Sequence, residues 1–381
     1  MQRRDFLKSL GALSAAMALP KNAWASINPS GKTLVLIELN GGNDSLNTFV
    51  PHMTEAYYTS RPTLSLGLNE VITLSDSLAM HEALEPLKPA WDEGDMAVVQ
   101  GLGYANPNRS HFRSKDIWNT ASDRDMLFDS GWLAEQLSVT SREDLQAITL
   151  GGRSGPLDGE DLNSLVVTHI DWLLKRHARE FGAANTDNPA LNHVLAVQED
   201  FNESLTSLKE GMAGSVKPDS DFPKTQLGRA LESVARLLSV GVRPAIFKLN
   251  LGGFDTHTNQ RAKHKMLLGQ LAEALAKFRE ASVASGTWSN TTVVTYSEFG
   301  RRVAENGNKG TDHGTAASHF VLGGSVLGGI YGEMPSLVDL DTRGDLIFTQ
   351  DYRGYYRTLT DWLGWNPGER LLGHTGLGFL A

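Results

Sequence analysis

The pattern of apolar and polar positions divides the chain into short apolar runs and longer amphipathic stretches. The runs are rich in β-branched residues and apolar without alternation, as strands buried on both faces of a parallel sheet are. They lie at residues 33–39, 96–102, 145–151, 244–251, 291–297 and 319–324. Helical patterns lie between them, at residues 82–94, 110–120, 188–212, 227–238 and 267–278. Strands alternating with helices predict an α/β fold with a central, mostly parallel β-sheet and helices on both faces.

Composition is that of a globular chain. Of the 381 residues, 40% are hydrophobic and 21% are charged. The sequence has no uninterrupted apolar stretch of about eighteen residues, the length that a membrane-spanning helix needs. We therefore expect a soluble protein with no stable membrane span. The chain has no cysteine, so any metal must be bound by oxygen and imidazole.

The N-terminus has the features of a twin-arginine export signal. The segment "QRRDFLK" is followed by an apolar run at residues 10–19 and by "AWA" at residues 23–25, a small-x-small cleavage site. This order disfavours an amphipathic first helix of the fold. We expect residues 1–25 to be a signal peptide, the protein to be periplasmic or otherwise exported, and the twin-arginine translocase to be its partner during export.

Charge argues against one class of partner. The whole chain has a formal net charge of −9, and without residues 1–25 it has 31 basic and 43 acidic residues, a net charge of −12. Because nucleic-acid binding depends on neutralising phosphates with Lys and Arg, we expect no nucleic-acid partner.

The domain organisation follows from the loops. Segments 151–164 and 214–224 have loop compositions, and neither has the features of a domain boundary. We expect residues 26–381 to form a single domain with a helical insertion near residues 125–225.

Polar segments follow several of the predicted strands. They are "NGGND" after the first strand, "GGFDTHTNQ" after the strand at 244–251, and "EFGRR" and then "GTDHG" after the strand at 291–297. Taken singly, each fits a tight turn or a helix cap. Ligands in open α/β sheets bind at the carboxyl ends of strands, however, so the segments together predict a site at one edge. The candidate metal ligands are Asn40, Asp44, Asp255, His257, Glu298, Asp312 and His313, with His319 as a further candidate.

A mixed set of imidazoles and carboxylates selects among metals. It argues against Ca²⁺ and favours Zn²⁺, Mn²⁺ or Mg²⁺, with Zn²⁺ or Mn²⁺ first. One or two ions are compatible with the set. Two ions would clamp the attacking and leaving oxygens of a displacement at phosphorus or sulfur.

The segment "NRSHFRSKDIW" adds candidate catalytic residues. The strand at 96–102 leads through a Gly/Asn/Pro turn into a helix that begins near Ser110. Ser110 is a candidate nucleophile at this helix N-terminus, and an ordinary N-cap is the equal alternative. Arg109 or Arg113 is a candidate anion clamp. His111 is a candidate ligand or general acid/base, or a structural residue.

The order of these motifs behind a twin-arginine signal resembles the bacterial family called domain of unknown function 1501. The resemblance covers nearly all of the mature chain, and that family is grouped with the alkaline phosphatase superfamily, which includes sulfatases and cofactor-independent phosphoglycerate mutases. It implies an alkaline phosphatase-like fold, two metal ions and a Ser, Thr or modified Cys nucleophile.

The resemblance also assigns positions. The aspartate that ends the superfamily's first strand corresponds to Asn40, with Asp44 four residues on; its Asp and His after a later strand correspond to Asp255 and His257. The superfamily's Ser-Asp-His-Gly segment corresponds to Ser297-Glu298-Phe299-Gly300, so that Glu298 replaces the aspartate and a phenylalanine replaces the histidine. The superfamily's last histidine corresponds to His313. These departures leave open whether one ion or two are bound.

Three functions compete on these observations. The first is an exported metal-dependent hydrolase of phosphate or sulfate esters, with a small-molecule or polymer ester as substrate. The second is an esterase, because "GGND" at 41–44 resembles a block of the Gly-Asp-Ser esterases; no Gly-Asp-Ser precedes it, which disfavours this function. The third is a non-catalytic exported binding or assembly protein that retains the fold.

Overall fold

The computed structural model describes residues 30–137, 145–159, 162–168 and 221–381, together with Asn28, Ile170 and scattered positions from 187 to 212. Within them a nine-stranded sheet has the order β11-β5-β10-β9-β1-β8-β6-β7, with β12 beside β5. All six predicted strands are in it: β1 (Thr33–Asn40), β5 (Met96–Gly103), β6 (Ala147–Leu150), β8 (Ile246–Gly252), β9 (Thr291–Tyr296) and β10 (Ala317–Gly323). The additional strands are short: β7 (Ser164–Val167), β11 (Gly329–Tyr331) and β12 (Gln350–Asp351).

The strands of this sheet run mostly in one direction. The pairs β1·β8, β1·β9, β6·β8, β6·β7, β5·β11 and β5·β12 are all parallel. Among the described strands of the sheet, β10 alone runs the other way, antiparallel to both β5 and β9. The start of β10 therefore lies at the same edge as the carboxyl ends of its neighbours.

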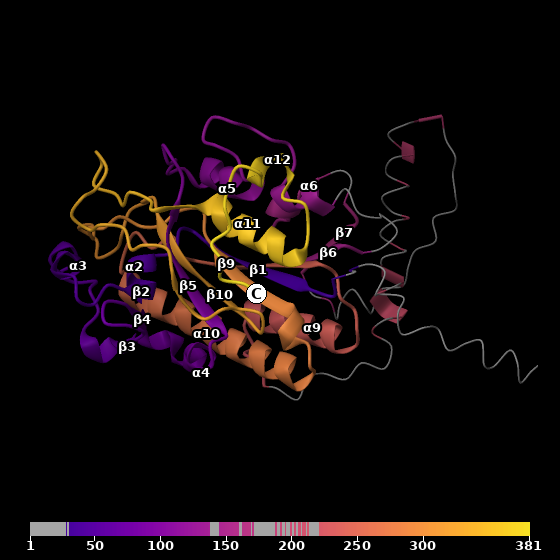
Figure 1. Cartoon of the computed structure of the whole chain (residues 1–381), viewed down its shortest axis with the longest axis horizontal. Helices are drawn as coiled ribbons and strands as arrows, with labels where there is room; N and C mark the ends of the chain where they lie inside the picture. Colours follow the sequence, from indigo (N-terminus) through magenta and orange to yellow (C-terminus); the bar gives the residue numbers. More distant parts are fainter. Residues whose placement is uncertain are drawn as a thin grey trace, which may run out of the picture.

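Helices cover both faces of the sheet (Figure 1). On one side lie α5 (His111–Thr120), α6 (Trp132–Leu137), α11 (Tyr352–Leu363) and α12 (Gly368–Leu371). On the other lie α4 (Lys88–Asp92), α9 (Gln226–Ser239) and α10 (Gln260–Ala284). Strand residues alternate between the two cores: Leu34 and Leu36 pack with the first set of helices, and Val35 and Ile37 with the second. The predicted α/β class is confirmed.

The predicted helices are found where the structure describes the chain. The stretches at 110–120, 227–238 and 267–278 correspond to α5, α9 and α10, and the stretch at 82–94 forms η2 (Glu82–Leu87) followed by α4. The other 3-10 helices are η1 (Leu68–Glu70), η3 (Gly155–Leu157) and η4 (Trp288–Asn290). Much of the stretch at 188–212 lies outside the described residues. Within the expected insertion near 125–225, β6 and β7 extend the central sheet.

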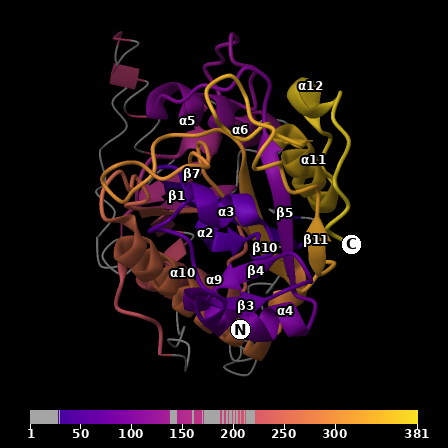
Figure 2. The same ribbon diagram turned by 90° about the vertical axis from the view of Figure 1, so that its left-hand side faces the viewer.

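A second small sheet covers one end of the central sheet. It has the order β2-β4-β3, formed by β2 (Phe49–Val50), β4 (Ala79–His81) and β3 (Val71–Thr73). With α2 (Ser45–Thr48) and α3 (Glu55–Ser60) it lies on the side that faces the viewer in Figure 2. Arg61, fully buried after α3, donates from Nη1 to Asp44 Oδ2 at 2.7 Å. This ion pair joins the segment that follows α3 to the segment that follows β1.

A buried histidine makes the fold sensitive to acid. His319 in β10 is fully buried beside Trp118, with ring centroids 5.7 Å apart, and burial lowers its pKa from 6.5 to about 3. The folded state therefore binds fewer protons than the unfolded state below pH 6.5. His319 alone therefore lowers the free energy of unfolding by about 1.4 kcal/mol per pH unit as the pH decreases from 6.5 towards 3.

We predict that His319→Leu and His319→Gln both reduce the loss of stability between pH 7 and pH 4 by about 3 kcal/mol. The reason is that neither side chain binds a proton. Urea unfolding at a series of pH values measures this slope, whatever each substitution does to stability at pH 7. A wild-type slope in both variants would contradict the prediction.

Candidate metal centre

Four loops bring polar side chains to one edge of the central sheet. His111 begins α5 after β5, and Asp255 and His257 follow β8. Glu298 follows β9, and His313 precedes β10. His313 reaches this edge because β10 runs antiparallel to its neighbours. The predicted gathering of imidazoles and carboxylates at one edge thus includes a residue from the start of a strand.

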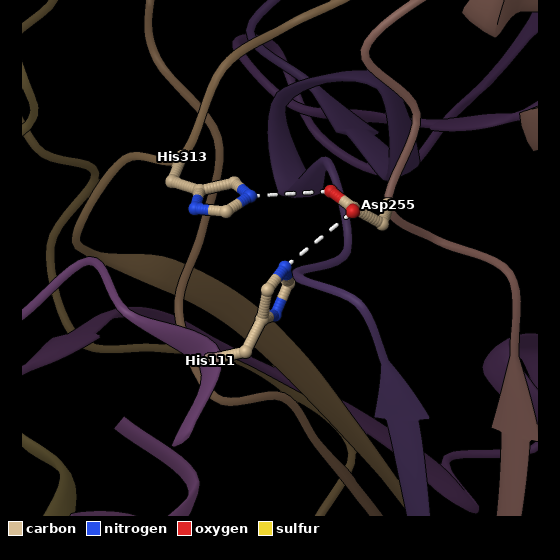
Figure 3. A group of neighbouring side chains, drawn as sticks. All are labelled: His111, Asp255 and His313. Carbon is tan, nitrogen blue, oxygen red and sulfur yellow. Dashed lines mark hydrogen bonds and ion pairs between the residues drawn. The ribbon is translucent and has the colours of Figure 1, made fainter. Parts of the chain in front are cut away.

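Two histidines of this edge, His111 and His313, point towards the Asp255 carboxylate (Figure 3). His313 Nε2 lies 3.2 Å from Asp255 Oδ1, and His111 Nε2 lies 3.5 Å from Asp255 Oδ2. One ligand atom from each of the three residues lies within 4.8 Å of the others. His257 joins them, since its Nε2 is 3.0 Å from Asp255 Oδ1 and 3.0 Å from His313 Nε2. The four residues form a cluster of three imidazoles and one carboxylate.

Each histidine of this cluster is held through its other ring nitrogen. The contacts are His111 Nδ1 to Glu298 Oε1 at 2.8 Å, His257 Nδ1 to Asp312 Oδ1 at 2.9 Å, and His313 Nδ1 to the Arg109 carbonyl oxygen at 2.8 Å. A carbonyl or carboxylate oxygen only accepts, so we assign the ring proton to Nδ1 in all three. Each Nε2 lone pair then points inward, as in histidines that bind metals.

The contact between His257 and His313 favours a cation at this point. With both protons on Nδ1, the two Nε2 lone pairs face each other across 3.0 Å. Neither nitrogen can donate to the other, so the approach is unfavourable unless a positive charge lies between or beside them. Burial lowers the pKa of His313, which disfavours a proton there. A divalent cation would accept both lone pairs.

Asp255 is kept ionised by a buried arginine. Arg301 is fully buried, and its Nη2 donates to Asp255 Oδ1 at 2.7 Å. Burial alone would raise the pKa of Asp255, but the Arg301 guanidinium outweighs it and holds the pKa well below its usual range. The Asp255 side chain is nevertheless 45% exposed. The cluster is therefore both charged and open to solvent.

Glu298 has a supporting position behind His111. It is buried, and its carboxylate accepts from Gly41 N at 3.0 and 3.1 Å and from Gly42 N at 3.2 Å. Lys115 Nζ lies 3.7 Å from Glu298 Oε1. Burial alone would raise the pKa of Glu298, but the hydrogen bond from His111, the backbone N–H groups and the Lys115 charge lower it. Glu298 is therefore ionised, and its carboxylate orients His111 by accepting a hydrogen bond from Nδ1.

The double glycine after β1 is required by close packing. Gly41 has φ +118°, and a Cβ there would lie 2.4 Å from Asp255 N. Gly42 has φ +78°, and a Cβ there would lie 2.4 Å from the Phe299 ring. That ring packs against His111 and His313, with centroid distances of 5.0 and 4.6 Å. The glycines thus let the backbone pass close to Asp255 and to the Phe299 ring.

Other predicted site residues have different partners. Asn40 Oδ1 accepts from Lys115 Nζ at 2.7 Å, and the buried Asp44 pairs with Arg61 and accepts from Gln260 Nε2. Burial alone would raise the pKa of Asp44, but Arg61 lowers it below its usual value. Asp312 holds His257 from behind.

The residues predicted on the α5 side also have clear positions. The Arg109 guanidinium pairs with Asp341 at 2.7 Å and Asp345 at 2.5 Å, while its carbonyl holds His313. Arg113 pairs with Asp116. Ser110 is exposed at the N-cap of α5, and its hydroxyl makes no hydrogen bond within the described residues.

Sequence reasoning missed two cations of the site. Arg301 lies within the segment "EFGRR", where its burial was not foreseen. Lys115 follows His111 by four residues in α5, and residues at this spacing share one face of a helix. That spacing was a usable signal for Lys115, whereas the partners of Arg301 lie far away in sequence.

The fold and this cluster define an α/β protein with a candidate metal centre at the carboxyl edge of its sheet. The chain belongs to the family described as "Protein of unknown function (DUF1501)", whose model matches residues 97–343. Residues 1–20 match the signal sequence of the twin-arginine translocation pathway. The predicted family and twin-arginine export are confirmed, and the translocase is the partner during export.

Comparison with solved structures gives distant similarities. One is a lipoteichoic acid synthase from Listeria monocytogenes, with 10% identity over 93% of this chain and 78% of that chain and a TM-score of 0.41. A protein in the alkaline phosphatase superfamily from Vibrio parahaemolyticus has 12% identity over 90% and 69%, with a TM-score of 0.41. A phosphonate monoester hydrolase of Agrobacterium radiobacter has 13% identity over 92% and 77%, with a TM-score of 0.39.

Two further findings concern curated proteins and membrane-spanning helices. No curated protein matches the chain. None of the helices in the described part of the chain has the length and apolarity needed to cross a membrane. Because the TM-scores above lie below 0.5, the chemistry of the site has to be argued from its own residues.

We predict that Gly42→Ala lowers the free energy of unfolding by more than the backbone strain of about 1–3 kcal/mol, because the new Cβ also displaces Phe299. The matched control is Gly344→Ala, since Gly344 has φ +80° and a Cβ there would meet no atom of the surrounding residues within 4 Å. Urea unfolding measures both variants. Equal losses of stability would mean that the Phe299 contact is unimportant.

We predict that Glu298→Gln weakens zinc binding by about 10–100-fold, because it removes the ionised acceptor behind His111. Competition with a zinc chelator measures the affinity. Glu333→Gln, at an exposed position, is the control and should bind zinc as the wild type does. Unchanged affinity in Glu298→Gln would contradict this supporting role.

Proposed function

We propose that the protein is an exported hydrolase of phosphate or sulfate esters that depends on one divalent metal ion, Zn²⁺ or Mn²⁺. The observation that carries the proposal is the convergence of three imidazole Nε2 atoms on the Asp255 carboxylate. The twin-arginine signal supports the exported location.

The donor set supports a metal ion of this kind. Three histidines and one aspartate match the nitrogen and oxygen ligands of zinc sites, and carboxylate oxygen also suits manganese. His111, Asp255, His257 and His313 would hold the ion. The His257 and Asp255 side chains are 41% and 45% exposed, so a ligand from solvent can reach them. Catalytic metal sites keep a coordination position for water or substrate, which beside these four protein ligands would be a fifth position.

The bound ion would supply Lewis acidity towards a phosphoryl or sulfuryl oxygen. The chain's own residues would supply the remaining functions. Lys115, next to Glu298 and one helical turn beyond His111, would add positive charge near an anionic substrate. Hydrolysis breaks the bond between phosphorus or sulfur and the ester oxygen; one water supplies a hydrogen to the alcohol and a hydroxyl to the acid. Ser110 is the proposed nucleophile, through its exposed hydroxyl at the start of α5. Its Oγ would bond to phosphorus or sulfur as the bond to the ester oxygen breaks, and its proton would pass to the departing alcohol. The water would then cleave the Ser110 ester, which releases the acid and restores the hydroxyl.

The contacts of Arg109, the proposed anion clamp, support a second candidate function without catalysis. Arg109 is already paired with two aspartates, Asp341 and Asp345, and Asn40 has an amide where the superfamily has a carboxylate ligand. Both observations favour a non-catalytic exported protein that retains a metal ion. The two candidates share the metal and differ in turnover.

We predict that protein purified from the exported fraction contains one equivalent of zinc or manganese, and that Asp255→Ala and His313→Ala lose it. Elemental analysis measures the metal. His52→Ala is the control, because His52 lies in the turn after β2, and it should keep the wild-type content. Absence of metal from the wild type under all loading conditions would overturn the hydrolase proposal.

Turnover separates the two candidates. Phosphate monoesters, phosphate diesters and sulfate esters are tested with metal-loaded wild type, Asp255→Ala and Ser110→Ala. We expect hydrolysis of at least one class, abolished in Asp255→Ala and strongly reduced in Ser110→Ala. Equal rates in wild type and Ser110→Ala would remove Ser110 from the mechanism, and metal binding without any hydrolysis would support the non-catalytic protein.

A further inference from the structure

We propose that the protein has a second ligand site, for a small amphipathic anion with one aromatic ring, in a two-part cavity on the far side of Phe299 from the metal centre. This inference goes beyond the proposed function and does not depend on it. It stands on the shape of the cavity, the chemistry of its walls and the charges at its outer part.

The inner part of the cavity is apolar. It has a volume of about 270 Å³, and its walls include the aromatic side chains of Tyr104, Trp118, Phe299 and Phe348. An apolar cavity of about 150 Å³ is large enough to bind benzene, so this part can hold one substituted ring. Aromatic walls favour an aromatic ring, because offset and edge-to-face contacts add to the burial of apolar area.

The outer part of the cavity is larger and has both polar and apolar walls. It has a volume of about 660 Å³ and shares Asn106, Pro107, Asn108, Asp341 and Ile347 with the inner part. The two parts therefore adjoin along the segment 106–108, and the proposed ligand spans both. A ligand with its ring in the inner part would extend its remaining atoms into the outer part.

Two of the guanidinium groups at the outer part have no close carboxylate partner within the described residues. Three arginines line it. Arg109 pairs with two aspartates, Asp341 and Asp345. Arg124 lies 3.9 Å from Asp125, whose side chain is 92% exposed, and within the described residues the Arg343 guanidinium has no acidic partner. Two guanidinium groups thus remain for a carboxylate or another compact anion.

The cavity is separate from the metal centre but adjoins it. None of the four proposed metal ligands lines either part within the described chain. Phe299 forms the common wall: its ring lines the inner part and packs against His111 and His313. Arg109 is a second link, since its side chain lines the outer part and its carbonyl holds His313.

The test uses 3-phenylpropionate as the probe and neutral 3-phenylpropan-1-ol as its matched partner. Calorimetry follows the binding of each to the mature protein, once loaded with zinc and once after removal of metal by a chelator. We expect the anion to bind in both states, and about tenfold more tightly than the alcohol, because a charge-assisted hydrogen bond is lost with the carboxylate. Binding of the anion that requires zinc would place it on the metal and overturn the proposal.

Variants locate the probe. Ile347→Trp narrows the junction of the two parts, and Ile347 is 46% exposed, so that the larger side chain is tolerated by the fold. It should weaken both probes about tenfold or more. Val338→Trp, at a position 80% exposed and outside the cavity walls, is the control and should bind both probes as the wild type does.

Charge variants test the outer part. Arg124→Gln and Arg343→Gln should each weaken 3-phenylpropionate several-fold and leave 3-phenylpropan-1-ol unchanged, while Arg153→Gln, outside the cavity, changes neither. No binding of either probe to the folded wild type, or affinities unaffected by Ile347→Trp, would overturn the proposal. Loss of the metal or of hydrolysis would leave this outcome untouched, so the two proposals fail independently.

Discussion

The candidate metal centre depends on the backbone turn at Gly41 and Gly42, which binds one acidic and one basic side chain. The amide groups of Gly41 and Gly42 donate to the Glu298 carboxylate, while their carbonyl groups accept from the Arg301 guanidinium. Glu298 in turn orients His111, and Arg301 orients Asp255. Two of the four proposed metal ligands are thus positioned through the peptide units of two adjacent glycines. Because these units are buried, each unmade hydrogen bond would leave a polar group without water or partner.

The direction of β10 explains why histidines from distant segments meet. An all-parallel sheet would bring only segments that follow strands to the carboxyl edge. Reversal of β10 adds a segment that precedes a strand, and His313 lies in it. The bridge between Arg301 and His313 joins this segment to the one that follows β9. The cluster therefore needs both the parallel strands, which bring His111, Asp255 and His257 to this edge, and the antiparallel β10, which brings His313.

The sequence predicts those features of the fold that depend on neighbouring residues, and not those that depend on distant ones. Apolar runs identified six strands, because burial on both faces leaves a continuous signature. The direction of β10 and the small sheet around β4 have no such signature, since strand pairing is decided by distant partners. The motif "DTH" predicted that Asp255 and His257 lie at the sheet edge, where the structure has them. The pairing of Asp44 with Arg61 could not be predicted, because an aspartate near a strand end looks the same in the sequence whether it binds a metal or an arginine.

The donor set of the cluster bears on the compartment to which the signal directs the protein. Imidazole and carboxylate groups are the proposed ligands, and the chain has no cysteine. Thiolate ligands are prone to oxidation or to disulfide formation in an oxidising compartment. Nitrogen and oxygen donors undergo neither reaction. A metal centre made in this way keeps the same ligands on both sides of the membrane, because its donor groups do not respond to the redox poise that the protein meets after export.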